Sequence, residues 1–261
     1  VNRGFCSSQL ANRDGEGIAY LPVSQTVLIS GEADGRILEY DPNGQLTHRE
    51  AEVPAIYRKA DRNLGFEALG YNADTHRVWT CNDGPRSDSR NGARNRLRFQ
   101  SFDEALKPIA QYAYLTDAPL STRTSALFAM GVPTITPLSD GSLLVLEREF
   151  YVSPAKLGSY VNCRLFQAWP DTPLTSEDCL NRDDVLYMAK HLLTRLRHVP
   201  GPTSDRWPAG DHLCVRLARS VLRGAQRLVQ DPCCPPEIAR RALPHPLPIC
   251  LVLRRPFPQF L

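Results

Sequence analysis

The stretch EALGYNADTHRVWTCND, residues Glu67 to Asp83, decides the fold because the chain contains it in two versions. It aligns without a gap over EGIAYLPVSQTVLISGE, residues Glu16 to Glu32, which lies 51 residues earlier. Both copies show an acid, a short apolar segment, a polar turn, a second apolar segment and another acid. The Pro, Ser, Asn and Asp residues in the turns favour chain reversal. Each copy therefore predicts a β-hairpin with a carboxylate at both ends.

A third, looser copy is GVPTITPLSDGSLLVLERE, residues Gly131 to Glu149, in which Glu147 follows the second predicted strand. Each copy is followed by further predicted strand, within residues 35–46, 95–108 and 160–169. A repeat of about 50 residues with three or four strands is typical of a β-propeller blade. We therefore predict an all-β protein, a β-propeller with three to four blades visible. Three blades would leave its ring incomplete.

The strand pattern ends near residue 176. Residues 177–261 form a basic tail rich in Arg, Pro and Cys, with 12 Arg against 1 Lys. A helix is predicted over residues 183–199, where Asp precedes and Arg follows the apolar centre. A second is predicted over residues 212–230 from an apolar stripe. We therefore divide the chain into a propeller portion, residues 1–176, and an atypical helical or disordered tail, residues 177–261.

Three interpretations of this tail stay open: a helical appendage, a disordered basic tail, or sequence translated in a non-native reading frame. The excess of Arg over Lys, the Pro and Cys enrichment and the abrupt loss of pattern favour the third. Because the excess of basic residues belongs to the tail alone, it does not indicate a nucleic-acid partner.

The composition excludes several other classes of protein. A hydrophobic content of 42% and a charged content of 23% are those of a globular protein. No apolar run is long enough for a transmembrane helix, and no signal peptide is visible after Val1. The eight cysteines lack the C-x-x-C spacing of zinc sites. No nucleophile elbow, P-loop or dinucleotide fingerprint occurs.

The hairpin segments resemble the phytase-like family, also labelled esterase-like activity of phytase, over about residues 12–170. Three motifs carry the resemblance in order: NLGFEAL (Asn63–Leu69), the acid Asp83 after the next strand, and LSDGSLLVLER (Leu138–Arg148). The resemblance implies a β-propeller that is periplasmic or secreted. It also implies hydrolysis of phosphate or other esters.

The innermost strands of all propeller blades surround one axial channel, so acids at equivalent blade positions are expected to meet there. Clustered carboxylates repel one another unless a cation lies between them. Ca²⁺ takes six to eight oxygen ligands and is the expected ion. Its candidate ligands are Glu16, Glu32, Glu67, Asp83 and Glu147.

We expect Glu67, Glu147 and Arg148 to act as catalytic residues. Arg123 and Arg148 are the expected substrate-binding residues, because a guanidinium group suits phosphate oxygens. The partner would be a small-molecule ester or phosphate, and the protein a monomer without a nucleic-acid partner. In the structural alternative, each acid only caps a turn or pairs with a neighbouring Arg. In the functional alternatives, the protein is a non-catalytic propeller that binds a ligand or protein, or an inactive truncated fragment.

Overall fold

The computed structural model describes residues 13–59, 65–82, 95–120, 128–153, 158–175, 180 and 182–198. This part of the chain is β-sheet with one short 3-10 helix, η1 (Ala55–Lys59). The strands are β1 (Gly15–Leu21), β2 (Thr26–Gly31), β3 (Ile37–Tyr40), β4 (Leu46–Glu50), β5 (Phe66–Asn72), β6 (Arg77–Asn82), β7 (Arg96–Phe102), β8 (Pro108–Leu115), β9 (Phe128–Pro137), β10 (Leu143–Tyr151), β11 (Tyr160–Trp169) and β12 (Ala189–His198). No helix in the described ranges is both long and apolar enough to cross a membrane.

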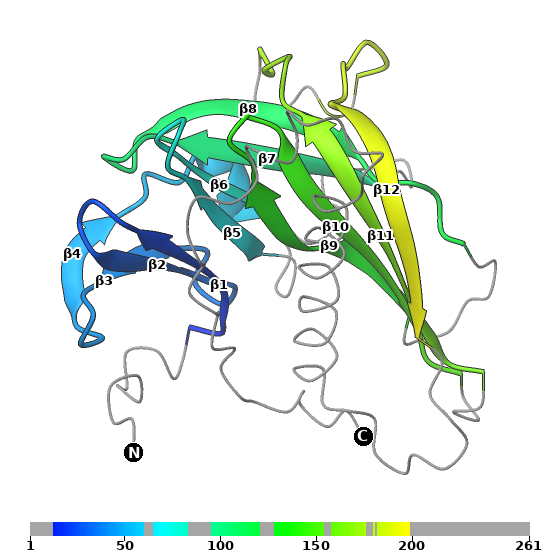
Figure 1. The fold of residues 1–261 in the computed structure, drawn as a ribbon, viewed down its shortest axis with the longest axis horizontal. Helices are drawn as coiled ribbons and strands as arrows, with labels where there is room; N and C mark the ends of the chain where they lie inside the picture. Colours follow the sequence, from blue (N-terminus) through cyan, green and yellow to red (C-terminus); the bar gives the residue numbers. More distant parts are fainter. Residues whose placement is uncertain are drawn as a thin grey trace, which may run out of the picture.

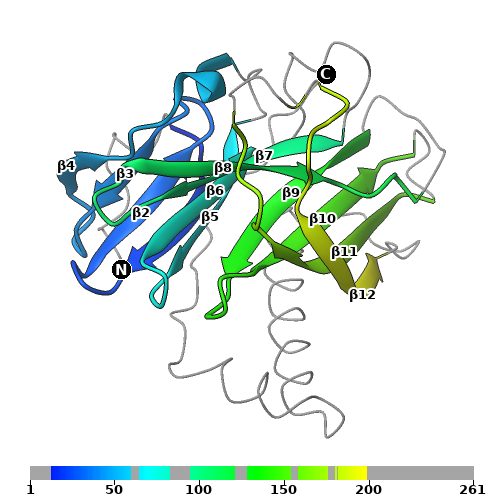
Figure 2. The same ribbon diagram turned by 90° about the horizontal axis from the view of Figure 1, so that it is seen from above.

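The strands form three antiparallel sheets of four, and in each sheet the strand order follows the chain. We call them blade 1 (β1–β4), blade 2 (β5–β8) and blade 3 (β9–β12). The first strands of the blades lie together, β1 against β5 and β5 against β9. Seen from above, the three sheets stand side by side along the chain order (Figures 1 and 2). Four-stranded meanders joined through their first strands are β-propeller blades, which confirms the predicted fold class.

The repeated hairpins form as predicted, and the repeat extends to backbone geometry. Gln25 and His76 end equivalent turns, and both have positive φ angles, 54° and 53°. The pairing of β1 with β2 and of β5 with β6 shifts at the same place, near Glu16 and Glu67. The pairing of β9 with β10 also shifts, between Leu146 and Arg148 in the middle of β10. A bulge of this kind bends a strand and re-aims the side chains beside it.

Residues Ala189–His198 of the predicted tail form a strand, so the helix predicted over residues 183–199 is wrong. β12 pairs with β11 from Ala189 to His198 and forms the outer strand of blade 3. The open edge of β11 supplies backbone hydrogen-bond partners that would otherwise go unmatched. Blade 3 therefore continues beyond the boundary expected at residue 176. The second predicted helix and the rest of the tail lie outside the described residues.

The connection between β11 and β12 returns along the outer edge of blade 2. The N–H of Leu174 donates to the carbonyl of Gln111 at 2.7 Å, and the N–H of Met188 donates to the carbonyl of Ala113 at 2.9 Å. Tyr187 and Ala113 form a parallel bridge. These bonds occupy part of the edge of β8, and a covered edge cannot pair with another chain.

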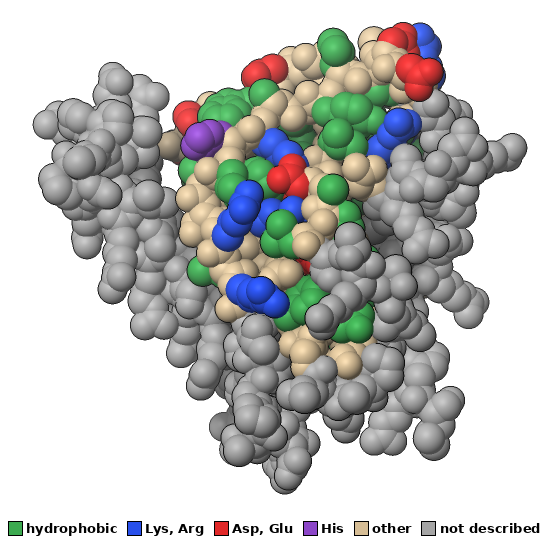
Figure 3. Space-filling model, turned by 90° about the vertical axis from the view of Figure 1, so that its right-hand side faces the viewer, with side chains coloured by type: hydrophobic (Ala, Val, Ile, Leu, Met, Phe, Trp, Pro, Cys, Tyr) green, Lys and Arg blue, Asp and Glu red, His purple; other side chains and the backbone are tan. Residues whose placement is uncertain are grey.

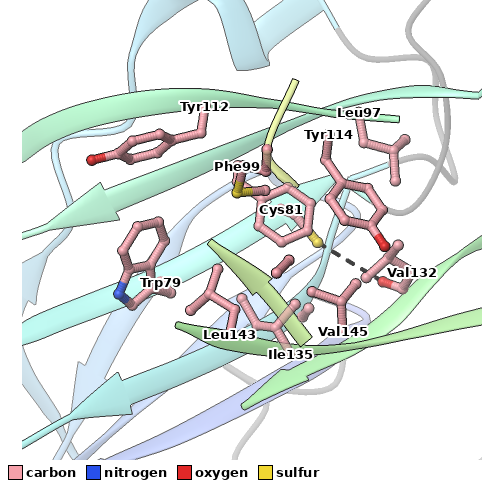
Figure 4. Packing of buried hydrophobic residues seen from close by; sticks show 13 residues of the cluster. Trp79, Cys81, Leu97, Phe99, Tyr112, Tyr114, Val132, Ile135, Leu143 and Val145 are labelled. Carbon is pink, nitrogen blue, oxygen red and sulfur yellow. Dashed lines mark hydrogen bonds between the residues drawn. The ribbon is translucent and has the colours of Figure 1, made fainter. Parts of the chain in front are cut away.

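Apolar side chains fill the spaces between the blades. Between blades 1 and 2 the core contains Ala19, Leu21, Leu28 and Ile37 from one side and Phe66, Leu69, Val78 and Phe102 from the other. Between blades 2 and 3 it contains Trp79, Cys81, Leu97, Phe99, Tyr112 and Tyr114 facing Val132, Ile135, Leu143 and Val145 (Figure 4). Each large side chain buried in this way contributes about 1.5–3 kcal/mol. The blades are therefore held face to face by two apolar interfaces.

Candidate functional site

Three carboxylates gather where β1 begins and β2 ends. The ligand oxygens of Asp14, Glu16 and Glu32 all lie within 4.8 Å of one another. The N–H of Glu32 donates to the carbonyl of Asp14 at 2.8 Å, which ties the two strand ends together. Asp14 and Glu16 are exposed and Glu32 is half-buried. The structure thus brings together two of the predicted metal ligands, Glu16 and Glu32. We call this group, with Asp14, the acidic cluster.

Blade 2 lies directly against the acidic cluster. A Cβ atom on Gly17 would lie 2.8 Å from the carbonyl oxygen of Glu67, and a Cβ atom on Gly65 would lie 3.0 Å from the carbonyl oxygen of Glu32. Glycine at both positions allows this approach because it has no Cβ. The backbone at Glu67 is therefore adjacent to the end of blade 1 that carries the cluster.

Blade 3 contributes a positive charge to the same end of the molecule. Nη2 of Arg148 lies 3.9 Å from Oε2 of Glu67, and the two side chains are 27% and 17% exposed. A partly exposed ion pair of this length contributes little to stability. Its main effect is to place a guanidinium group beside the Glu67 carboxylate of blade 2. Glu67 and Arg148, two of the predicted catalytic residues, are therefore brought together.

Glu147 lies in another environment. Neighbouring side chains on a strand point to opposite faces, and Glu147 points into the interface with blade 2, where its side chain is 0% exposed. Its Oε1 accepts hydrogen bonds from the Tyr114 hydroxyl at 2.8 Å and from Lys190 Nζ at 2.7 Å. Its Oε2 lies 3.3 Å from Nη2 of Arg164 and accepts from the N–H of Asp117 at 3.1 Å. The structure does not bring Glu147 together with Glu67.

The surroundings of Glu147 are those of a buried ionic network. Burial and the Glu147 carboxylate raise the pKa of Tyr114 well above its usual value, so its hydroxyl remains a hydrogen-bond donor. Lys190 also contacts Asp117 Oδ1 at 2.8 Å and lies over the ring of Phe166 at 4.2 Å. These contacts match the structural alternative, in which an acid pairs with neighbouring basic residues. Through Lys190, β12 is joined to Glu147 of blade 3 and to Asp117, which follows the last strand of blade 2.

Two predicted site residues, Asp83 and Arg123, lie outside the described residues. Sequence reasoning missed Asp14, which precedes β1 in a left-handed conformation with a φ of 51°. Its only signal was its position two residues before Glu16. The aligned repeat begins at Glu16 and so left Asp14 out.

The arrangement offers two kinds of chemistry side by side. Three carboxylates within 4.8 Å of one another form a set of hard oxygen ligands of the kind that Ca²⁺ prefers. The guanidinium group of Arg148 suits an anionic group such as phosphate or carboxylate. Glu67, beside Arg148, has a carboxylate that could accept a proton. This end of the blades could therefore hold a cation and an anionic group together.

Comparison with solved structures finds distant likenesses. A protein of unknown function from Bacteroides caccae is 10% identical with a TM-score of 0.34, over 70% of this chain and 60% of that one. A catalytically inactive virginiamycin B lyase from Staphylococcus aureus, solved with quinupristin, is 12% identical with a TM-score of 0.32, over 60% of this chain and 53% of that one. This chain thus spans less than two thirds of either protein. TM-scores below 0.5 leave the fold to be argued from strand pairing alone.

A search of curated proteins finds no match. The family model named Phytase-like, described as esterase-like activity of phytase, matches residues 7–208. This confirms the resemblance predicted over residues 12–170 and extends it through β12. The match takes in all three blades and the axial end where the acidic cluster, Glu67 and Arg148 lie. The chain belongs to the phytase-like family.

Proposed function

We propose that this protein hydrolyses small phosphate or other esters at the axial end of its blades. The observation that carries the proposal is the convergence of three blades there. Blade 1 supplies the acidic cluster, and blades 2 and 3 supply the Glu67–Arg148 pair beside it. Opposite charges held next to each other suit a substrate with an anionic group and a polarised ester bond.

The residues divide by chemistry. Asp14, Glu16 and Glu32 would hold Ca²⁺, which as a bound Lewis acid polarises an ester oxygen. Arg148 would bind and orient the anionic group of the substrate through its N–H donors. Glu67 would accept a proton from the attacking water at its carboxylate oxygen.

We also propose that the protein is exported to the periplasm or the cell exterior. Protein modules outside the cell bind Ca²⁺ with dissociation constants of about 10⁻⁴–10⁻³ M. A cluster of three carboxylates, two of them exposed, fits affinities at this weak end because water competes for the ion. Ca²⁺ binding in this range is therefore the expected measurement for the isolated protein.

The test is an assay of the purified chain on p-nitrophenyl phosphate and p-nitrophenyl acetate, with Ca²⁺ or with EGTA. We expect turnover that depends on Ca²⁺ and falls by about 10²-fold or more in Glu67→Gln, since a general base contributes at least that much. Glu16→Gln should weaken Ca²⁺ binding. The matched control is Glu50→Gln, because Glu50 is an exposed carboxylate of blade 1 that pairs with Arg36.

A folded sample without turnover of either substrate would reject the hydrolase. Ligand binding without turnover, still sensitive to Arg148→Ala, would favour the second function, a non-catalytic propeller that binds an anionic ligand at the same end. The observation behind this alternative is that the Glu67–Arg148 pair is partly exposed and loose, at 3.9 Å.

A further inference from the structure

One face of β11 carries a buried side-chain amide that the described chain does not use. Asn162 is 7% exposed, and its side chain forms no hydrogen bond among the described residues. Its neighbours on the same face are both occupied. The Tyr160 hydroxyl donates to Glu149 Oε1 at 2.9 Å, and Nη1 of Arg164 donates to the carbonyl of Ala118 at 2.8 Å. A buried amide without a partner is costly, so a partner from outside the chain is expected.

Two exposed arginines of β12 lie on the same face as this amide. The pairing of β11 with β12 sets Arg197 directly opposite Asn162 and Arg195 directly opposite Arg164. Directly opposite residues share one face of a sheet, with Cβ atoms about 4.5–5.5 Å apart. Arg195 and Arg197 are exposed, and neither forms an ion pair within the described part of the chain. Their charges are therefore available to an anion.

The other charges on this face largely neutralise one another. Arg164 and Lys190 both contact Glu147 and Asp117. Glu149 is the third carboxylate, and its two oxygens accept hydrogen bonds from a tyrosine hydroxyl and a backbone N–H. Together with the two arginines of β12, these residues include one more cation than carboxylates. Lys and Arg side chains gather on the side of the molecule that carries β12 (Figure 3), which favours the approach of an anion.

An aromatic ring holds one of the two arginines in place. The guanidinium carbon of Arg197 lies 5.6 Å from the centre of the Tyr160 ring, a distance at which a cation is attracted to the ring face. Tyr160 in turn stacks on Tyr151, with ring centres 5.3 Å apart. A side chain fixed before binding loses less freedom when a ligand arrives. The planar N–H donors of a guanidinium group suit the oxygens of phosphate or carboxylate.

We propose that Asn162, Arg195 and Arg197 form a second anion-binding site, which takes the phosphate or carboxylate group of a small ligand. All three side chains supply N–H donors, so the ligand atoms that they bind are acceptors. The site is separate from Arg148. Glu149 lies directly opposite Asn162 in the pairing of β10 with β11, and the residue before it therefore points to the other face of the sheet.

The first test is calorimetric titration of the full chain with inorganic phosphate, without Ca²⁺ and in an Arg148→Gln background that removes the axial guanidinium group. We expect binding at one site. Its affinity should fall at least about tenfold in Asn162→Leu and in Arg197→Gln, because each removes a hydrogen bond to a charged ligand. The control is Arg36→Gln, since Arg36 is an exposed arginine of blade 1 that pairs with Glu50. Acetate binding with the same dependence on the variants also supports the proposal and identifies a carboxylate ligand.

Thermal melts in the same background separate binding from a structural role of the amide. Without phosphate, Asn162→Leu should melt at or above the temperature of its parent, because an apolar group of similar volume replaces an unpartnered amide. Added phosphate should raise the melting temperature of the parent but not of this variant.

Three results would overturn the proposal: no binding of either anion, binding that Asn162→Leu and Arg197→Gln leave intact, or a lower melting temperature of Asn162→Leu without phosphate. The last would show that the amide is paired within the chain. The titration needs neither Ca²⁺ nor turnover, so this proposal and the hydrolase can fail separately.

Discussion

Replacement of Glu147 by leucine tests whether this buried carboxylate joins blades 2 and 3. The two side chains are similar in volume, so the change leaves little cavity. It removes the acceptor of the Tyr114 hydroxyl and of the Asp117 N–H. It also removes the negative partner of Lys190 and of Arg164, whose side chain is 4% exposed. The guanidinium group of Arg164 is too deeply buried to be hydrated instead.

The expected loss of stability is large. Removing one partner of a buried ion pair costs about 3–5 kcal/mol, and an orphaned buried donor costs about 1–3 kcal/mol. Asp117 offsets part of this because it keeps its 2.8 Å contact with Lys190, although it is 41% exposed. We expect the free energy of unfolding to fall by about 3–5 kcal/mol. A typical domain has about 5–15 kcal/mol in total.

Urea unfolding measures this change, with tryptophan fluorescence as a probe because Trp79, one of the three tryptophans, lies in the interface between blades 2 and 3. The matched control is Glu50→Leu. Glu50 and Arg36 form an exposed pair, with side chains 49% and 55% exposed, and removing such a pair costs at most about 1 kcal/mol. A loss below about 1 kcal/mol for both variants would refute the reasoning. Catalysis lost at unchanged stability in Glu147→Gln would point to the catalytic role first expected for Glu147.

Two further predictions concern the close approach of blades 1 and 2 and the turn end of blade 2. Gly17→Ala should destabilise the protein by about 1–3 kcal/mol, because its Cβ would lie 2.8 Å from the Glu67 carbonyl oxygen. Gly15→Ala is the milder comparison in thermal melts, since its nearest atom would be a side-chain methyl at 3.3 Å. Burial and the hydrogen bond to Glu104 raise the pKa of Tyr71 to about 12. The folded chain then keeps a proton that the unfolded chain loses above about pH 10, so stability should fall between about pH 10 and 12. Tyr71→Phe should flatten this decline in urea midpoints measured across that range, and an unchanged slope would contradict it.

The blades could be predicted because their hairpins repeat with a fixed spacing. A hairpin turn depends on neighbouring residues, so the turns at Leu21–Thr26 and Asn72–Arg77 can be recognised from the sequence. β12 could not be predicted in this way. Leu192, Leu193 and Leu196 fit one face of a helix as well as they fit a strand, and the open edge of β11 decides between the two.

The site was predictable in part for the same reason. Glu16, Glu32 and Glu67 lie at repeated strand ends, and the structure places them at one end of the blades. The environment of Glu147 depends on Lys190, which lies 43 residues further along the chain in a segment expected to be helical. Sequence spacing carries no information about such a contact. Burial of a carboxylate is a tertiary property, because its compensating charges come from distant strands.

The bonds along β8 have a consequence for synthesis of the chain. Ala113 is translated long before its partners Tyr187 and Met188. At about 5–20 residues per second, several seconds pass during which blade 2 exists with an uncovered edge. Nascent chains on successive ribosomes of one messenger each pass through the stage at which this edge is uncovered. The outer strand of blade 2, β8, is therefore the place where two unfinished copies can pair wrongly. The risk ends once the connection between β11 and β12 has been synthesised and covers this edge.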